Sequence, residues 1–553
     1  MSDVFTQEII KDALVALGDE MFDAMIRTSM SPIIYESTDF AIGVTDASGN
    51  LIAQGNGVAA FLAVLDTAVQ ATLQRYPGPN DIAPGDVILT NIPYEGGGTH
   101  LSDVVVIVPV FYGERLIAWA VNKAHWTEVG GAHAGSVSTQ STEIYQEGLQ
   151  LPFVKLFERG QINNALVDVI RCNVRLPQST IGDMHAGVAA CRVGARRVVE
   201  LAGKYGVESV TTAMAGLLDY GERITREELR KLPPGVYEAE DILDNDGLGN
   251  GPFKIKVKVT ITPERMIADF SGTDGPAKGP INCSFISLVS GARCIFKAAV
   301  NSDSTVNGGC FRCFEVVCPP GTLISAQAPA PVALYYEGVR AAMTALWEAL
   351  APAVPHRLPA GQDGAITFVS GMHPDSGELF VLGEPLVSGS GASPGKDGDG
   401  GLFGGGGGGT HNIPVELSDT RYGLRVEQYA FHTEDGGAGE FRGGKGVVLD
   451  YRVTSEEAFL TYANSRPSPP WGLNGGQPGS SNDVKIFRND GSVETHRMCT
   501  GVRVAKDELI RLTTSTGGGF GDPARRPRGL VERDLKNEII TLAQAQRDYG
   551  SAP

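Results

Sequence analysis

Long hydrophobic runs, cysteine and positive charge are all scarce in this sequence of 553 residues. No stretch reaches the roughly 18 apolar residues that a membrane-spanning helix needs, and the first residues lack the basic and apolar regions of a signal peptide. Eight cysteines are too few for a disulfide framework in a chain of this length. We therefore expect a cytoplasmic protein with reduced thiols and no membrane partner.

Basic residues are outnumbered by acidic ones. The chain has 46 Lys and Arg against 64 Asp and Glu, a formal net charge of −18. Such a chain is a poor non-specific binder of nucleic acids, so we expect no nucleic-acid partner. Hydrophobic residues make up 42% and charged residues 20%; this ordinary globular composition excludes disorder as the main state. The length suggests about two to four folding units.

Glycine, in contrast, is abundant. The 71 Gly and 32 Pro residues predict many turns and close backbone approaches, and they argue against an all-helical bundle. Residues 396–409 are mostly glycine. This segment is either a linker between domains or a loop whose backbone approaches a ligand or another chain.

Hydrophobic periodicity predicts an α+β protein with several domains, antiparallel sheets and a helical middle segment. Predicted helices lie at 6–30, 184–202, 208–231, 330–350 and 529–547. Predicted strands lie at 40–44, 51–53, 87–89, 103–111, 115–124, 254–262 and 266–270, and residues from 420 onward are rich in strands. We divide the chain into an N-terminal α/β segment (1–180), a helical segment (181–235), a mixed segment (236–395) and a glycine-rich loop followed by strands (396–553).

The clearest predicted hairpin, 103–111 with 115–124, places two of the nine histidines at its open end. A two-residue turn at Tyr112-Gly113 pairs His100 with His125. A turn at the next two residues shifts the register by one step and pairs Ser102 with His125. Side chains directly opposed on two strands have Cβ atoms about 4.5–5.5 Å apart, and at that distance two imidazoles can bind one metal ion.

Asp103 lies at the same end of this hairpin. Residues three apart on a straight strand face opposite sides, so Asp103 joins His100 only if the glycine-rich backbone at 96–98 allows a bend. Two imidazoles and a carboxylate suit Zn²⁺, Mn²⁺ or Fe²⁺. From spacing alone, the alternative stays open that both histidines are hydrogen-bonded structural residues that bind no metal.

Weaker candidates occur elsewhere. Cys310, Cys313 and Cys318 approach a zinc spacing, but the last two face opposite sides of a predicted strand. Ser393 lies in a Gly-x-Ser-x-Gly pattern, which we interpret as a turn because no helix follows it. The chain has no phosphate-binding loop pattern and hence no recognisable ATP site of its own. Glu36 and Asp39 precede the first hairpin, where most carboxylates are solvated or capping.

Three motifs together resemble the hydantoinase B/5-oxoprolinase family. They are Glu-Ser-Thr-Asp-Phe at 36–40, Gly-Gly-Gly-Thr-His-Leu-Ser-Asp at 96–103 and Lys-Ala-His-Trp-Thr-Glu-Val-Gly-Gly at 123–131. The resemblance continues at 269–274, 279–282, 434–444 and 516–523. It spans nearly the whole chain in the right order, which is much more specific than any single motif.

The resemblance implies a function and a site. Metal ligands of the family match His100, Asp103 and His125, with Asp39 as a further matched carboxylate; Zn or Mn is the expected metal. Asp39 or Glu36 would be the general base. The family implies a hetero-oligomer in which an A-type, actin-like ATPase subunit uses ATP to phosphorylate a substrate oxygen. The B-type subunit then completes hydrolysis of a cyclic amide, such as a hydantoin, a lactam or a 5-oxoproline-like ring.

Two alternatives stay open. The chain could be a subunit of an ATP-dependent ketone carboxylase, or a scaffold subunit without chemistry of its own. Many relatives carry His-His before Asp-Ile-Gly-Gly, whereas Trp126 and Glu128 stand at two of those positions here, so the roles of these two side chains are open. The chain is shorter than acetone carboxylase subunits of this type and shows no fused ATPase part, which favours a stand-alone B-type subunit of an amidohydrolase.

Overall fold

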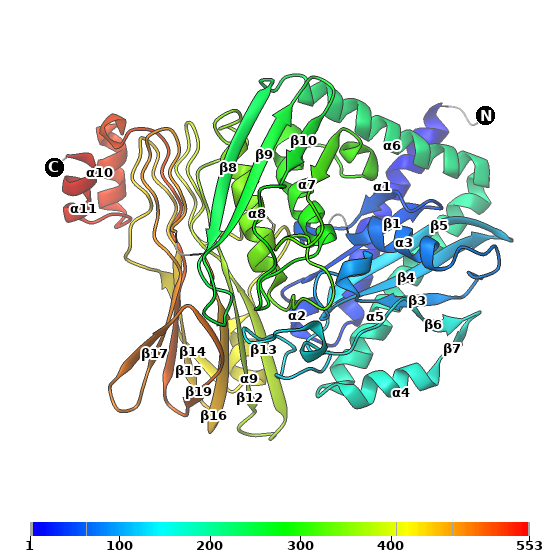
Figure 1. Cartoon of the computed structure of the whole chain (residues 1–553), viewed down its shortest axis with the longest axis horizontal. Helices are drawn as coiled ribbons and strands as arrows, with labels where there is room; N and C mark the ends of the chain where they lie inside the picture. The colour runs from blue at the N-terminus through cyan, green and yellow to red at the C-terminus, as the bar shows by residue number, and fades with distance from the viewer. Residues whose placement is uncertain (1–3, 62–63, 405, 467, 551–553) are drawn as a thin grey trace.

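The computed structural model describes residues 4–61, 64–404, 406–466 and 468–550. Within these ranges the strands form four sheets, nearly all of whose pairs are antiparallel, and helices cover several sheet faces (Figure 1). The predicted α+β class is therefore confirmed. Among these residues, no helix has both the length and the apolar character that crossing a bilayer requires.

The first sheet has seven strands in the order β2-β1-β5-β4-β3-β6-β7, all paired antiparallel. They are β1 (Phe40–Asp46), β2 (Leu51–Gln54), β3 (Val87–Thr90), β4 (Asp103–Tyr112), β5 (Arg115–His125), β6 (Val154–Glu158) and β7 (Gln161–Ile162). The predicted strands from 40 to 124 are confirmed. β4 and β5 lie in the middle of the sheet, and most of their residues are buried, as expected for strands covered on both faces.

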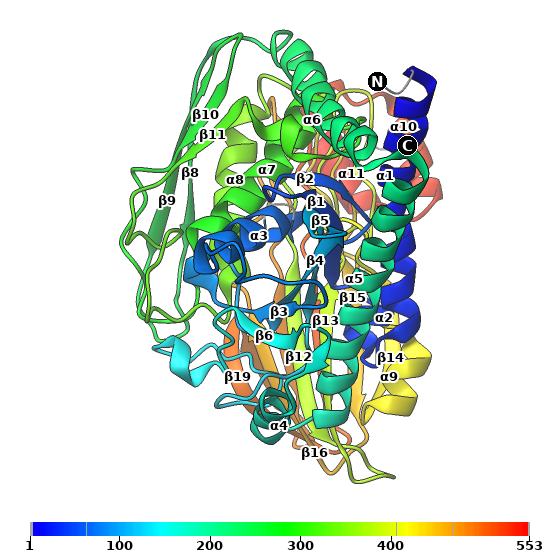
Figure 2. The ribbon, with the colours of Figure 1, turned by 90° about the vertical axis from the view of Figure 1, so that its right-hand side faces the viewer.

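Helices cover both faces of this sheet. Helix α1 (Val4–Thr28) packs with α5 (Pro177–Tyr205) and α6 (Val207–Leu229) on one face, whereas α3 (Val64–Arg75) lies on the other (Figure 2). The predicted helices at 6–30, 184–202 and 208–231 are confirmed. The short helices α2 (Pro32–Tyr35) and α4 (Asn164–Asn173) flank this layer.

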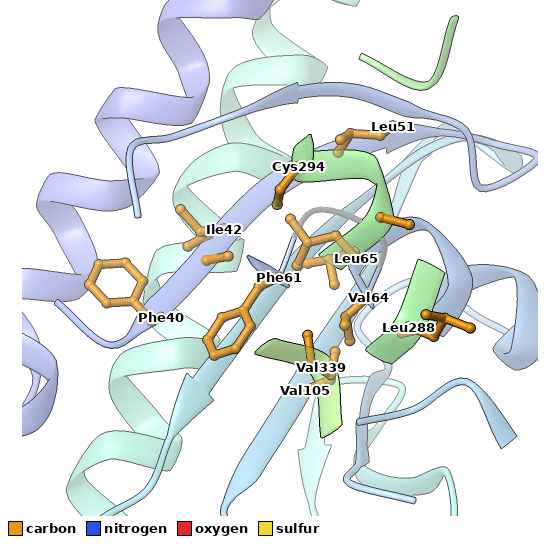
Figure 3. Close-up of a cluster of buried hydrophobic side chains, with 14 of the residues drawn as sticks. Phe40, Ile42, Leu51, Phe61, Val64, Leu65, Val105, Leu288, Cys294 and Val339 are labelled. Atoms are coloured by element: carbon orange, nitrogen blue, oxygen red, sulfur yellow. The ribbon is translucent and has the colours of Figure 1, made fainter. Parts of the chain in front are cut away.

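Side chains from several elements meet in one continuous hydrophobic core. Figure 3 shows Phe40 and Ile42 of β1 and Val105 of β4 near Leu65 of α3, Leu288 of α7 (Phe285–Asn301) and Val339 of α8 (Tyr335–Leu350). Each such side chain contributes about 1.5–3 kcal/mol when fully buried. Helix α7 has no counterpart among the predicted helices. Most of its residues are buried.

The second sheet has four strands, β8 (Gly235–Leu243), β9 (Phe253–Ile261), β10 (Met266–Asp269) and β11 (Phe314–Val317). Its order is β11-β10-β9-β8, and only the β10–β11 pair is parallel among its pairs. Helix α8 packs against β8 and β9. The predicted strands at 254–262 and 266–270 are confirmed, and the predicted helix at 330–350 begins five residues later, at Tyr335, after the prolines at 329 and 331.

The C-terminal part contains two further sheets. One has the order β13-β12-β16-β19 and the other β14-β15-β20-β17-β18. Their strands are β12 (Ala365–Met372), β13 (Leu379–Leu386), β14 (Leu424–Phe431), β15 (Val447–Val453), β16 (Glu457–Ala463), β17 (Asp483–Phe487), β18 (Val493–His496), β19 (Met498–Ala505) and β20 (Leu509–Thr513). Leu382 and Leu460 of one sheet share a separate core with Leu449 and Ile510 of the other, the arrangement of a β-sandwich.

The C-terminal helices differ from the prediction. A single helix was expected at 529–547, but the structure has α10 (Arg528–Lys536) and α11 (Leu542–Tyr549). The chain turns between them, and Thr541 starts α11 by accepting a hydrogen bond from the backbone N–H of Gln544. This capping box satisfies backbone donors that a continuous helix would not expose. One more short helix, α9 (Val415–Arg421), precedes β14.

Much of the excess glycine lies in a set of extended segments that we call the glycine bundle: residues 389–398, 436–444, 471–479 and 515–521. These segments run side by side outside the named strands, with isolated β-bridges such as Phe441–Phe520, and they bond backbone to backbone, as between Gly437 N and Gly517 O at 2.8 Å. A Cβ atom on Gly517 would lie 1.8 Å from the carbonyl oxygen of Ser390. The expected close backbone approaches are therefore present, because only glycine permits this spacing.

The glycine-rich segment 396–409 is not a linker. The backbone N–H of Ala60 donates to Gly406 O at 3.0 Å, and the N–H of Gly409 donates to Gly57 O at 3.0 Å. The segment thus packs against the start of the first layer of the same chain. Its predicted approach to a ligand or to another chain stays a prediction. The division of the chain at residues 180, 235 and 395 stays a prediction.

Candidate metal centre and its cavity

The β4–β5 hairpin places Asp103 directly opposite His125. Tyr112 pairs with Arg115, so the turn is Gly113-Glu114, the second of the two predicted turns. A bulge between Val110 and Phe111 then shifts the register by one more residue. Both predicted partners of His125, His100 and Ser102, are therefore wrong, because a bulge adds a residue to one strand without a signal in the spacing.

The bend that the sequence required before β4 is present. The N–H of Asp103 donates to His100 O at 3.1 Å and closes a turn. Gly98 lies just before this turn, and a Cβ atom added to Gly98 would lie 2.8 Å from Asn91 O. As a result His100 Nε2 lies 3.3 Å from Asp103 Oδ2, on the same side of the chain.

His100, Asp103 and His125 form a compact, buried cluster. His100 Nε2 lies 3.2 Å from His125 Nδ1, which lies 3.3 Å from Asp103 Oδ1. One nitrogen or oxygen from each residue falls within 4.8 Å of the others, and the described ranges contain no other His, Cys, Asp or Glu cluster of this kind. Asp39 Oδ2 lies 4.0 Å from His125 Nδ1 and its side chain is 29% exposed, so Asp39 is the carboxylate of this group that water can reach.

A backbone carbonyl orients the His100 ring. His100 Nδ1 lies 3.0 Å from Ala333 O. Because a carbonyl only accepts, this contact favours the tautomer with the proton on Nδ1, which leaves Nε2 available as a metal ligand. The neighbouring Val332 N–H donates to the buried Glu147 carboxylate at 2.9 and 3.1 Å. Burial raises the pKa of Glu147 to about 7, although these hydrogen bonds oppose the shift.

A buried ammonium group holds the other side of Asp103. Lys123 Nζ lies 2.9 Å from Asp103 Oδ2 and donates to Thr99 Oγ1 at 2.9 Å, while Thr99 donates to the same carboxylate oxygen. Nζ also lies 3.0 Å from the centroid of the Phe61 ring, a cation–π contact. Burial lowers the pKa of Lys123 to about 8, against the attraction of Asp103.

These contacts leave one oxygen of Asp103 without a hydrogen bond. Burial by itself would raise the pKa of Asp103, but the charges of Lys123 and His100 hold this pKa well below its usual range. Its Oδ1 is buried and accepts no hydrogen bond, which is costly for an ionised oxygen. Two imidazole nitrogens and this oxygen converge, with the Asp39 carboxylate beside them. This donor set fits a small divalent cation such as Zn²⁺ or Mn²⁺.

The cluster opens into a cavity of about 210 Å³. Asp39, His100, Asp103 and His125 contribute to its wall, together with residues of α8, the start of β12 and the end of β13. Phe403, Gly404, Gly406 and Gly407 of the glycine-rich segment also line it. Four distant parts of the chain therefore enclose the space in front of the candidate ligands.

Glu36 is not brought to this cavity. It follows α2 at its C-terminal end and is absent from the described residues that line the space, whereas Asp39 is among them. The proposed general-base role of Glu36 stays a prediction without support from its position.

Trp126 and Glu128 have structural surroundings. The Trp126 side chain is buried in the hydrophobic core, and the backbone N–H of this residue donates to Ser102 O at 2.8 Å. Glu128 accepts hydrogen bonds from Gly130 N at 2.9 Å and from Arg175 Nη1 at 2.7 Å. These contacts hold the loop after β5 against the segment between α4 and α5. The two departures from the family pattern therefore lie outside the candidate ligand set.

The cysteine and serine candidates are not part of a site. Cys310 and Cys313 are buried free thiols. Cys318 Sγ forms a hydrogen bond with Thr322 Oγ1 at 3.2 Å. Within the described ranges none of the three belongs to a cluster of metal-binding side chains. Ser393 exchanges backbone hydrogen bonds with Lys396 at 3.0 Å, which is the turn that its sequence context predicts.

Lys123, Tyr335 and Arg340 are cavity or cluster residues that we did not predict. The sequence does indicate that Lys123 lies near His125, because it precedes His125 by two residues and alternation puts both side chains on one face of β5. A lysine inside an otherwise apolar strand needs a buried partner. Tyr335, whose ring lies 4.9 Å from the His100 ring, and Arg340 belong to α8, and no local pattern connects that helix to the hairpin.

Comparison with known proteins gives consistent matches along the whole chain. The profile of the hydantoinase B/oxoprolinase family matches residues 3–523. A protein of Pseudomonas sp. assigned as the B component of a D-/L-hydantoinase is 30% identical over 99% of this chain and 95% of its own length. The beta subunit of the caprolactamase of Pseudomonas jessenii is 30% identical over 99% of this chain and 96% of its own. The crystal structure of the ATP-dependent caprolactamase from Pseudomonas jessenii superposes with a TM-score of 0.92 at 28% identity, covering 100% of this chain and 97% of that one.

Proposed function

The chain belongs to the hydantoinase B/oxoprolinase family, and we propose that it is the metal-binding subunit of an ATP-dependent hydrolase that opens a cyclic amide. The observation that carries this proposal is the unsatisfied Oδ1 of Asp103, buried 3.3 Å from His125 Nδ1 beside the cavity. Buried ionised oxygens in a purely structural cluster accept hydrogen bonds, and the 3.3 Å contact with His125 Nδ1 does not form one. A divalent cation would supply the missing partner.

Four residues would hold the cation. His100 Nε2, His125 Nδ1 and Asp103 Oδ1 converge, and Asp39 would be the fourth ligand or, alternatively, the general base. When bound, the cation would make a water molecule acidic near neutral pH and so available for attack. Burial raises the pKa of Asp39, against the opposing effect of His125. A carboxylate with a raised pKa is suited to accept a proton from the attacking water.

An ATPase partner would supply the activation. An unstrained amide is a poor electrophile, and transfer of a phosphoryl group from ATP to the amide oxygen makes the ring carbon easier to attack. Water would then add to that carbon and the ring C–N bond would break, with a proton passing to the nitrogen. A second water would release phosphate from the acyl phosphate so formed and leave the open-chain carboxylate. The names of two relatives, one a B component and the other a beta subunit, support a two-component assembly.

The experiment that tests this proposal combines metal content and turnover. The chain is purified with its ATPase partner, and elemental mass spectrometry is expected to find about one divalent metal per chain. His100→Ala and His125→Ala should lose both the metal and ring opening while the complex keeps its size in gel filtration. His133→Ala, a histidine outside the cavity, is the matched control and should keep both.

The outcomes separate the proposal from its alternatives. Full activity of His100→Ala or His125→Ala without metal would refute the mechanism. A product that requires bicarbonate and retains the ring would identify a carboxylase subunit instead. A complex that never binds metal and tolerates His125→Ala would identify a scaffold subunit.

A further inference from the structure

We propose that this cavity selects an uncharged amide with a hydrocarbon ring or substituent, and that it rejects an otherwise equal amide bearing a carboxylate. The inference rests on the proposed function for the identity of the reacting group, but the charge selection follows from the cavity wall. Its support comes from the side chains that face the cavity away from the candidate metal ligands, and from the pairing of the charges among them.

The wall beyond the candidate ligands is mainly apolar. Two aromatic side chains and four aliphatic or thioether side chains from three elements face this space: Val339, Met343, Trp347, Ile366, Phe368 and Leu386. Ligand surface that is buried against such side chains must itself be apolar to gain binding energy. A hydrocarbon ring fits this wall, whereas a charged group placed there loses its water shell.

Only one permanently charged cation faces the cavity within the described ranges, and it is already paired. Arg340 of α8 lines the space. Its Nη2 donates to the buried Glu337 carboxylate and its Nη1 donates to Gly364 O. Nη1 also lies 3.9 Å from Asp363 Oδ1. The charge of the guanidinium is therefore paired with two carboxylates of the wall, although its Nε is buried without a hydrogen-bond partner. An anionic ligand would meet no unpaired positive charge there.

The charges behind Arg340 also do not favour an anion. Asp363, which lines the cavity, lies 3.4 Å from Arg466 Nη1, and Arg466 Nε lies 2.9 Å from Asp241 Oδ2. Two guanidinium groups thus face three carboxyl groups, so this cluster carries no excess of positive charge. Lys123, the remaining nearby cation, is fully buried beneath Asp103 and is not a lining residue.

A carboxylate on the substrate would consequently be buried next to carboxylates without a counter-ion. Such a group costs several kcal/mol unless a cation pairs with it. Negative charge that forms on the reacting oxygen has a different place, at the cluster of His100, Asp103 and His125, where a divalent cation would meet it. The end of the cavity with the candidate metal ligands therefore favours a group that develops negative charge, and the apolar end favours an uncharged group.

A matched ligand pair tests the inference on the metal-loaded full chain. The probes are two six-membered lactams that carry either a methyl group or a carboxylate on the ring carbon next to nitrogen. Titration calorimetry should find that the carboxylate weakens binding by at least about 100-fold relative to the methyl group. Equal or tighter binding of the carboxylate, or no binding of the methyl lactam, would overturn the inference.

A pair of variants tests the physical cause. Thr344 lines the cavity one helical turn after Arg340. Thr344→Lys introduces a cation into the wall and should reduce the preference for the methyl lactam by at least about 10-fold. Thr344→Met has a side chain of similar length without the charge and should keep the preference. An unchanged preference in a folded Thr344→Lys chain would count against the inference, and if that variant does not fold, the ligand pair on the unmodified chain still decides.

Turnover in the complete complex separates this inference from the proposed function. If the methyl lactam binds selectively but neither lactam is opened with ATP and the partner, the proposed function fails and the selection stands. If both lactams are opened with similar kcat/KM, the selection fails and the proposed function stands.

Discussion

The protein contains two buried polar clusters near one cavity, and they differ in how their charges are satisfied. In the cluster around α8, the carboxylates of Glu337, Asp363 and Asp241 each lie within 3.4 Å of a guanidinium nitrogen or bond directly to one. In the hairpin cluster, Asp103 Oδ1 faces imidazole nitrogen and accepts no hydrogen bond. Every carboxylate of the first cluster thus faces a permanent cation, although Arg340 Nε, Arg466 Nε and Asp241 Oδ2 make no hydrogen bond. In the second cluster, the group that faces Asp103 Oδ1 is an imidazole.

The chemistry of the partner side chains explains this difference. A guanidinium stays protonated at every accessible pH, so an Arg–carboxylate cluster cannot exchange its proton for a metal. An imidazole is neutral near pH 7 and then offers a lone pair. Two buried clusters of similar polarity therefore have different capacities: the arginine cluster stabilises the joint between α8 and β12, and the histidine cluster can bind a cation.

The largest expected effect follows from breaking the arginine cluster. Arg466→Met leaves Asp241 buried without its cation and leaves Asp363 with Arg340 at 3.9 Å, so the free energy of unfolding should fall by about 3–5 kcal/mol. Urea denaturation measures this change. Added Zn²⁺ or Mn²⁺ should not restore the loss. Arg425→Met removes an exposed arginine and should cost less than about 1 kcal/mol; equal losses for the two variants would contradict the comparison.

A second prediction concerns Glu147, which holds the segment that orients His100. Its pKa is raised from 4.5 to about 7 in the folded chain, so the folded state binds the proton more tightly than the unfolded state. The contribution to stability is then lost as pH rises from about 4.5 to 7, by roughly 3 kcal/mol at most. Glu147→Gln cannot titrate and should remove this pH dependence in urea denaturation between pH 5 and pH 7.5.

The exposed Glu143 provides the control for that measurement. Glu143→Gln changes the same charge in the same loop but on the surface, and it should leave the pH dependence as in the unmodified chain. A pH profile that Glu147→Gln does not alter would show that this carboxyl group titrates alike in the folded and unfolded chain.

The smallest expected effect is metal stabilisation of the hairpin cluster. A ligand that binds only the folded state at 100 times its Kd stabilises it by about 2.7 kcal/mol, so Zn²⁺ or Mn²⁺ should raise the Tm of the chain. His125→Ala should lose this rise and His133→Ala should keep it. A metal-induced rise that persists in His125→Ala would place the cation elsewhere and remove the contrast between the two clusters.

Local patterns predicted a good part of the fold. The periodicity of α1, α5 and α6 and the alternation in β4 and β5 depend on residues a few positions apart, and these elements lie where expected. Helix α7, most of whose residues are buried, was not predicted. The break between α10 and α11 was missed because a capping box competes with helix continuation. The register of the hairpin was wrong because of one bulge at Val110 and Phe111.

The candidate ligands were predictable from the sequence, but the shape and charge of the cavity were not. His100, Asp103 and His125 lie within one hairpin and its preceding loop, so spacing and the family resemblance both indicate them. The walls come from α8, β12 and β13 and the glycine-rich segment, more than 200 residues further along the chain. Their contacts with the hairpin depend on the packing of the whole molecule, which no local pattern encodes.

The sequence by itself therefore determined the α+β class, the family and the residues able to bind a metal, because each of these depends on residue type and short-range spacing. The tertiary structure decided that Asp103 Oδ1 lacks a partner, that Arg340 is neutralised and that the glycine-rich segment closes on the cavity. These features depend on atoms from distant segments meeting within a few ångströms, and only the folded chain brings them together.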